Sequence, residues 1–132
     1  MLIEQKRVQA EKERIEFDIE IVPIEEWLFT DNDTCSLLGN LLDNAIEACK
    51  RIEQNDKWIS LQIEIQKNFL FIKISNSIDE MPVMKKGIPV STKQNKKRHG
   101  YGLKSVERIV NKYNGVITFR IEQNIFEVNI SF

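Results

Sequence analysis

Histidine and cysteine are scarce in this sequence. It contains one histidine and two cysteines among 132 residues, and they do not cluster with the spacing of zinc ligands. Cys35 and Cys49 fall in or beside one predicted helix, and 14 residues of continuous helix would separate them by about 21 Å. A disulfide between them is therefore excluded, and we expect both to be reduced thiols of a cytosolic protein.

Long apolar runs and an excess of either charge are also missing. No segment approaches the length of a membrane span, and the N-terminus is too polar for a secretory signal. The formal net charge is -1, which gives no reason to expect contacts with nucleic acid or with a membrane. Apolar residues make up 42% of the chain, enough for the core of one domain.

The spacing of apolar residues predicts an α+β fold. A charged, helix-prone segment (1–14) is followed by a strand (15–21), a helix (34–54, capped by Asp31 or Asp33) and a hairpin turning at Lys67 and Asn68 (58–75). A second helix (102–115, with Gly115 at its C-terminal cap) and a second hairpin (116–132) complete the order. This order is typical of a two-layer α/β sandwich, with helices on one face of a mixed, mostly antiparallel sheet.

Residues 76–99 carry no periodic pattern. They include two prolines and many polar side chains. Because so long a loop is unusual inside a compact domain, we expect either a functional lid or a disordered segment.

Two asparagines lie four residues apart in the first long helix, in SLLGNLLDNAIEACK. At about 100° per residue, Asn40, Asp43, Asn44 and Glu47 fall on one face and the apolar residues on the other. Asparagine is a mediocre helix former, so the pair indicates either a solvated polar face, the more common case, or a ligand.

A second candidate site is RHGYGLKSVERIV (98–110). Gly100 and Gly102 directly precede the second predicted helix, where backbone N–H groups can bind a phosphate; a simple glycine hinge is the alternative. Four nearby basic residues could neutralise phosphate charge or simply be solvated: Lys93, Lys96, Lys97 and Arg98. Asn76, at the end of a predicted strand, is either a turn residue or an amide suited to a purine edge.

Together, these segments resemble the GHKL, or Bergerat-fold, ATP-binding domain of bacterial sensor histidine kinases. LLGNLLDNAIEA is similar to the N box of that family, the strand ending at Asn76 to its first glycine box, and HGYGLKSV to its second. The resemblance covers residues 15–132 and is greatest for the branch that senses peptide pheromones in quorum sensing. Residues 1–14 would then be the end of a dimerisation-domain helix.

The resemblance implies roles for individual residues. Asn44 would coordinate Mg²⁺, which bridges the ATP phosphates, and Asn40 stands where ATP-hydrolysing relatives carry a glutamate that activates water. Because an amide cannot accept that proton, transfer to another acceptor would be favoured over hydrolysis. Asn76 would bind adenine. The other nucleotide-binding residues would be Arg98, His99, Gly100, Tyr101, Gly102 and Leu103, and residues 79–99 would form an ATP lid.

The resemblance also implies an incomplete phosphorelay. His99 lies in the expected lid, so the phosphoacceptor histidine would belong to a dimerisation domain outside this chain. The partners would be that domain and a response regulator, and the parent would be a membrane-bound sensor kinase with this domain in the cytoplasm. The alternatives are a docking module that no longer binds nucleotide and a serine kinase of the anti-sigma type.

Overall fold

The computed structural model describes residues 2–53, 56–79, 83–85, 88–90 and 96–132, with only the backbone at 83–85, 88–90 and 96–102. Five strands form one sheet in the order β1-β2-β3-β7-β6. Their bounds are β1 Glu16–Ile21, β2 Trp58–Gln66, β3 Phe69–Ser77, β6 Val116–Glu122 and β7 Ile125–Ser131. β1 is parallel to β2, and the other neighbours are antiparallel. This mixed, mostly antiparallel sheet confirms the predicted fold class.

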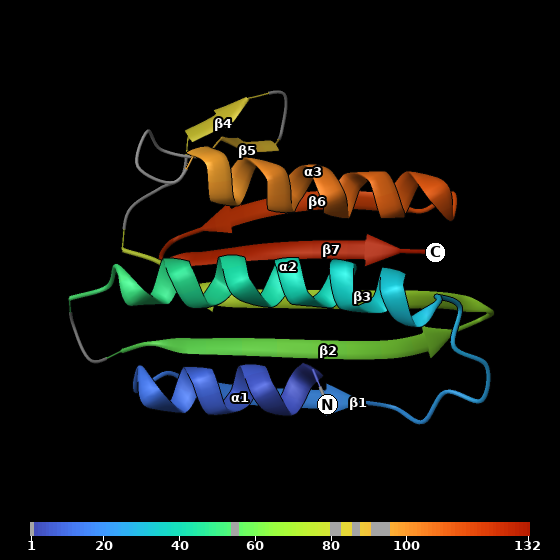
Figure 1. Cartoon of the computed structure of the whole chain (residues 1–132), viewed down its shortest axis with the longest axis horizontal. Helices are drawn as coiled ribbons and strands as arrows, with labels where there is room; N and C mark the ends of the chain where they lie inside the picture. Colours follow the sequence, from blue (N-terminus) through green and yellow to red (C-terminus); the bar gives the residue numbers. More distant parts are fainter. Residues whose placement is uncertain (1, 54–55, 80–82, 86–87, 91–95) are drawn as a thin grey trace.

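Three helices, α1 (Leu2–Lys12), α2 (Asp31–Lys50) and α3 (Lys96–Lys112), cover one face of the sheet (Figure 1). Successive strand residues point to opposite faces, so Leu61 of β2 and Ile72 of β3 point toward the helices, where both are almost completely buried. They meet Leu42 and Ile46 of α2 in a single core. The sheet's other face carries no helix of the described chain.

The N-terminus of α2 differs from the prediction in its capping residue. Thr30, not Asp31 or Asp33, occupies the N-cap, and its hydroxyl accepts a hydrogen bond from the backbone N–H of Asp33 at 3.1 Å. Both aspartates lie in the first turn, where their charge favours the positive end of the helix. The helix therefore begins three residues before the predicted start at residue 34, and it ends at Lys50 rather than 54.

Both predicted hairpins are confirmed. Lys67 and Asn68 have φ values of 49° and 71° between β2 and β3, as a tight hairpin with right-handed strand twist requires. Gln123, between β6 and β7, has φ 54°. The second predicted helix also ends near the expected place, but Asn114, with φ 58°, takes the left-handed position instead of Gly115.

The segment predicted to lack structure contains regular elements. Two short strands, β4 (Val83–Lys85) and β5 (Ile88–Val90), pair with each other, and α3 begins at Lys96, not at 102. No proline interrupts residues 96–112. The two glycines in the first turns of α3 cost about 1 kcal/mol each, while Leu103, Val106 and Val110 bury its apolar face.

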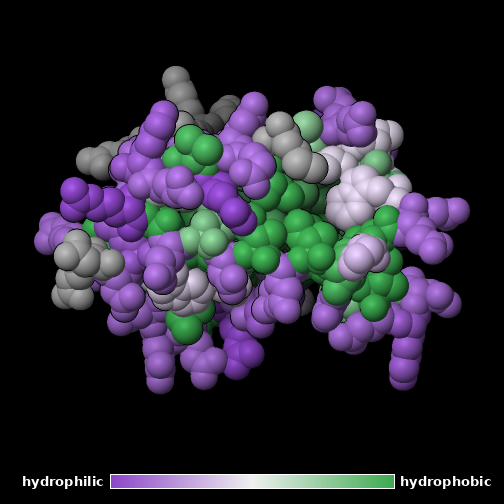
Figure 2. Space-filling model, turned by 90° about the horizontal axis from the view of Figure 1, so that it is seen from below, coloured by the Kyte–Doolittle hydropathy of each residue, from purple (hydrophilic) through white to green (hydrophobic). Residues whose placement is uncertain are grey.

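Apolar surface gathers at the sheet edge formed by β1. The half-exposed side chains there are Val8 on α1, and Ile21 and Val22 at the end of β1. Figure 2, which views the molecule from below, shows green apolar atoms on this side. No helix of the described chain is both long and apolar enough to cross a membrane.

Candidate functional site

The polar residues of α2 face two different neighbours. Asp33 Oδ2 accepts hydrogen bonds from the Lys112 ammonium (2.8 Å) and the Tyr113 hydroxyl (2.5 Å), so its side of α2 faces α3. Asn40 and Asn44 follow Asp33 by 7 and 11 residues, spacings that return to within about 20° of the same direction. The two amides therefore lie on the side of α2 that faces α3.

Asp43 has a different neighbour, although it lies within about 60° of Asn40 around the helix axis. Its carboxylate accepts a hydrogen bond from Lys6 Nζ of α1 at 2.5 Å. Asp43 points away from the Asn44 direction by about 100°, as consecutive helix residues do. Helix periodicity had grouped these polar residues because it cannot show that α1 and α3 flank α2 on different sides.

The two long helices run antiparallel, side by side (Figure 1). The Asp33–Lys112 ion pair joins the start of α2 to the end of α3. Asn44 lies 11 residues after Asp33, and residue 101 lies 11 residues before Lys112, so these two positions are at the same level along the antiparallel pair. By the same count over seven residues, Asn40 is level with Ser105. The first turns of α3 and the two amides therefore lie in the same part of the molecule.

Asn44 carries a buried polar atom without a partner. Its amide nitrogen is inaccessible to solvent and forms no hydrogen bond within the described structure. Such a group costs about 1–3 kcal/mol if it stays unpaired. Rotation of the amide by 180° exchanges its oxygen and nitrogen, so either end can take this position. An unpaired amide in this place suits a polar ligand between α2 and α3.

Asn76 lies on the helix-covered face of the sheet, one residue before the end of β3. It is 4% exposed, and its amide nitrogen donates to the Ser77 carbonyl at 2.9 Å. This bond determines which end of the amide is oxygen. Asn76 is thus a buried strand residue and not an exposed turn residue.

Ser77 is a polar residue of this region that the sequence did not single out. Its hydroxyl accepts a hydrogen bond from the Trp58 backbone N–H at 3.0 Å and lies 3.7 Å from Cys49 Sγ, near the end of α2. Burial raises the pKa of the Cys49 thiol. Only the tertiary contact between the ends of α2 and β3 reveals this group.

The other predicted ligand residues lie in α3. Arg98, His99, Gly100, Tyr101 and Gly102 all belong to its first turns, so the predicted glycine turn in front of the helix is wrong. The N–H groups without a partner inside α3 are those of residues 96–98, because the N–H groups of the first three residues of a helix have none. An anion at this terminus would meet these groups.

Leu103 is the one member of this series whose side chain the structure describes, and it is 8% exposed. Lys93 lies outside the described residues.

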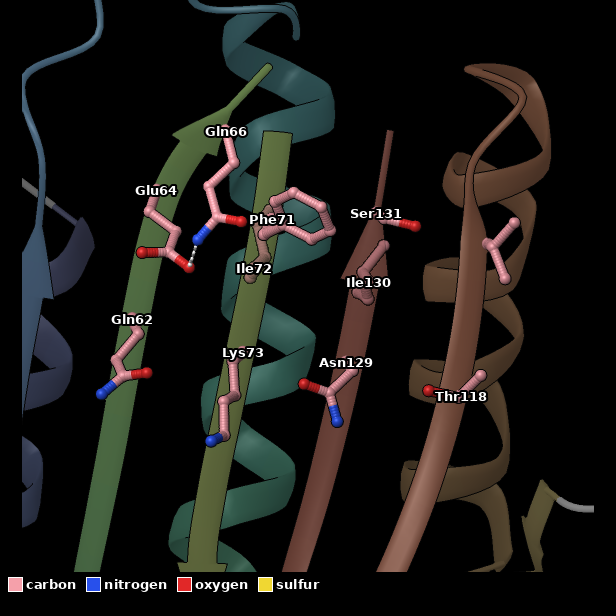
Figure 3. Close-up of a pocket in the computed structure, with 11 residues that line it drawn as sticks. Gln62, Glu64, Gln66, Phe71, Ile72, Lys73, Thr118, Asn129, Ile130 and Ser131 are labelled. Carbon is pink, nitrogen blue, oxygen red and sulfur yellow. Dashed lines mark hydrogen bonds between the residues drawn. The ribbon is translucent and has the colours of Figure 1, made fainter. Parts of the chain in front are cut away.

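A shallow hollow of about 300 Å³ lies on the opposite face of the sheet, away from the three asparagines. Figure 3 shows it in front of the strands, with the helices behind them. Its labelled lining residues are Gln62, Glu64, Gln66, Phe71, Ile72, Lys73, Thr118, Asn129, Ile130 and Ser131. The hollow is wide and has no cluster of convergent charges, so it does not contribute to the site between α2 and α3.

Acidic and metal-ligating side chains do not form a metal cage in the described ranges, since no group of three histidine, cysteine, aspartate or glutamate residues is placed to hold an ion. Two amides on one helix face are the polar groups that the site offers. Magnesium accepts few protein ligands and keeps several waters or phosphate oxygens, so this donor set fits an ion brought in with a phosphate-bearing ligand.

Comparison with known proteins gives the same fold. The family described as GHKL domain matches residues 30–132. The catalytic domain of the histidine kinase ThkA superposes with a TM-score of 0.74 and 21% identity, covering 99% of this chain and 89% of that chain. The Acinetobacter baumannii histidine kinase AdeS gives 0.69 and 17%, covering 99% of this chain and 62% of AdeS.

Full-length ShkA in complex with AMPPNP gives a TM-score of 0.69 with 15% identity, and this chain spans 28% of it. A search of curated proteins gives no match. The structural neighbours include histidine kinases that carry other domains besides this one. The family match covers most of the chain, from the cap of α2 to the last residue, and this chain belongs to the GHKL family.

Proposed function

We propose that this chain is the ATP-binding catalytic domain of a two-component sensor histidine kinase. It binds Mg-ATP between α2 and α3 and donates the γ-phosphoryl group to a histidine on a dimerisation domain outside the chain. The observation that carries this proposal is the buried, unpaired amide nitrogen of Asn44, on the side of α2 that faces the first turns of α3. Full-length ShkA, part of which has a similar fold, forms a complex with AMPPNP, and this supports a nucleotide as the ligand.

Asn44 would hold Mg²⁺ through its amide oxygen. The bound ion would neutralise phosphate charge. Gly100 and Gly102 have no side chains and flank the residue level with Asn44, which leaves room for phosphates beside α3. The free N–H groups of residues 96–98, including that of Arg98, would bind phosphate oxygens, and His99, Tyr101 and Leu103 would line the same end of α3.

Asn76 would receive the adenine. Its nitrogen is already hydrogen-bonded to Ser77, so its oxygen is the end that can accept from the exocyclic amino group. Asn40, level with Ser105, would orient the phosphates. Because its amide cannot act as a general base, ATP hydrolysis should stay slow in the absence of an acceptor.

The remaining parts of the proposal concern the parent protein. Residues 1–14 would be the end of a dimerisation-domain helix, and a response regulator would receive the phosphoryl group. The parent would be a membrane-bound kinase of the quorum-sensing branch that responds to peptide pheromones, and residues 79–99 would form the lid over the nucleotide.

A titration with a fluorescent ATP analogue and Mg²⁺ tests nucleotide binding. We expect saturable binding by the wild type and at least about ten-fold weaker binding by Asn44→Ala, equivalent to about 1.4 kcal/mol. Asn129→Ala is the matched control, because this asparagine lies on the opposite face of the sheet. If the wild type shows no saturable binding, the alternative of a docking module without nucleotide is favoured. If Asn44→Ala and Asn129→Ala bind equally well, the role of Asn44 is overturned.

Transfer is tested separately by incubation with radiolabelled ATP and separate histidine-bearing helical hairpins. We expect a phosphoryl group that is lost in acid, as phosphohistidine is. An acid-stable product on a serine would instead indicate a serine kinase of the anti-sigma type.

A further inference from the structure

Two of the contacts between α1 and α2 lie next to the two amides. Lys6 Nζ pairs with Asp43 Oδ1 at 2.5 Å, and Asp43 immediately precedes Asn44. A side chain at Gly39, which precedes Asn40, would begin 3.9 Å from Leu2 Cδ1. α1 therefore meets α2 one residue before each amide that faces α3.

The contact is partly shielded from water. The Lys6 side chain is only 16% exposed, although that of Asp43 is 47% exposed. Ala10, one turn further along α1, is completely buried in the core. The Lys6 ammonium thus lies at the interface between α1 and α2. Each helix contributes one residue to this ion pair.

Rotation of α2 would move the amides directly. A turn of about 20° displaces an atom that lies about 5 Å from the helix axis by roughly 2 Å. Displacements of about 1 Å already impair a site that positions reacting groups. Apolar packing already holds α2 on the sheet, and an ion pair between two single residues adds a preference for one rotation and one register.

We propose that Lys6 is a positioning residue for the nucleotide site: its ion pair with Asp43 holds α2 in the rotation that aims Asn40 and Asn44 at α3. The proposal rests on the proposed nucleotide site. It makes the position of α1 and the affinity for Mg-ATP mutually dependent, because a linkage between two sites acts in both directions.

The experiment uses the whole 132-residue chain with Lys6→Met, Asp43→Asn and the charge-swapped double variant K6D/D43K. Lys73→Met is the matched control, since Lys73 pairs with Glu127 at 3.3 Å on the sheet face without helices. Two measurements are made on each variant: binding of a fluorescent ATP analogue with Mg²⁺, and the NMR signals of the Asn40 and Asn44 side-chain amides without nucleotide. Urea unfolding shows that each variant is folded.

We expect Lys6→Met and Asp43→Asn each to weaken binding about five-fold and to shift both amide signals. The double variant should recover most of the affinity, and Lys73→Met should change neither measurement. A role in stability alone would lower the urea midpoint of Lys6→Met and leave affinity and amide signals unchanged, which would overturn the proposal.

Two further outcomes separate the explanations. If Asp43→Asn weakens binding and Lys6→Met does not, Asp43 acts on the nucleotide itself and the positioning role of Lys6 is wrong. If the wild type binds no nucleotide, the proposed function fails. The amide signals still decide the structural claim in that case, since unshifted signals in Lys6→Met would refute it.

Discussion

Asp33 of α2 and Tyr113 at the end of α3 are joined by a hydrogen bond of 2.5 Å between the tyrosine hydroxyl and the carboxylate. Lys112 donates to the same carboxylate oxygen. The Tyr113 ring also packs edge-on against Phe29, with centroids 4.8 Å apart. This cluster fixes one end of the α2–α3 pair, and the proposed nucleotide site lies toward the other end.

The charge of Asp33 should make folding stability depend on acid. The hydrogen bond from Lys112, followed by that from Tyr113, lowers the pKa of this carboxyl below its ordinary value. Its contribution is therefore present above the unfolded pKa of about 3.9 and is lost as the pH falls through the lower folded value. Asp33→Asn should lose less stability than the wild type between about pH 7 and about pH 3.

Urea midpoints at these two pH values measure the effect. Asp18→Asn is the control, because Asp18 is exposed on β1. An equal acid-induced loss of stability in Asp33→Asn and the wild type would show that the cluster does not stabilise the folded state through this charge.

The core under α2 should be sensitive to truncation. Leu42 is completely buried between α2 and the sheet, so Leu42→Ala should lower the free energy of unfolding by about 2–5 kcal/mol. Leu28 is 48% exposed, and Leu28→Ala should change it by less than about 0.5 kcal/mol. Chemical denaturation compares the two variants, and similar losses from both would contradict the assignment of the core.

Two glycines should respond in opposite directions to alanine. A Cβ at Gly115 would lie 2.7 Å from the Phe132 ring and 2.8 Å from the Ser131 carbonyl oxygen, so Gly115→Ala should destabilise the fold by about 1–3 kcal/mol. A Cβ at Gly39 would meet only Leu2 at 3.9 Å. Gly39→Ala should stabilise α2 by up to about 1 kcal/mol. Thermal unfolding of both variants tests the pair, and stabilisation by Gly115→Ala would refute the close contact with Phe132.

The two thiols should differ in reactivity. Cys35 is exposed and Cys49 is buried, and burial raises the pKa of the Cys49 thiol, so less of the reactive thiolate is present. Iodoacetamide should therefore modify Cys35 in the native protein and Cys49 only after unfolding in urea. Mass spectrometry of peptides identifies the modified residue, with Cys35→Ser as the control. Rapid native modification of Cys49 would show that the contact between α2 and β3 opens readily.

Local sequence was sufficient for most of the secondary structure. Alternating apolar residues predicted β2, and a leucine-rich period of about 3.6 predicted α2. The hairpin turn at Lys67 and Asn68 was predicted from the two strands that flank it, and the structure confirms it. Each of these features depends on neighbours within a few residues, which is why a single sequence contains the necessary information.

The start of α3 could not be predicted in the same way. Gly100 and Gly102 resemble a turn before a helix, yet both lie inside α3. Local preference favours the turn, while packing of Leu103 and Val106 into the core favours the helix. When packing and local preference differ by about 1 kcal/mol, only the folded arrangement decides between them.

The sequence by itself determined the fold class, the hairpins and the two amides on one side of α2. The tertiary structure alone decided that Asn44 faces α3 while Asp43 faces α1, that Thr30 caps α2, and that Ser77 meets Cys49. The physical reason is that helix periodicity gives the direction of a side chain relative to its own axis. The neighbour that lies in that direction depends on how separate elements pack.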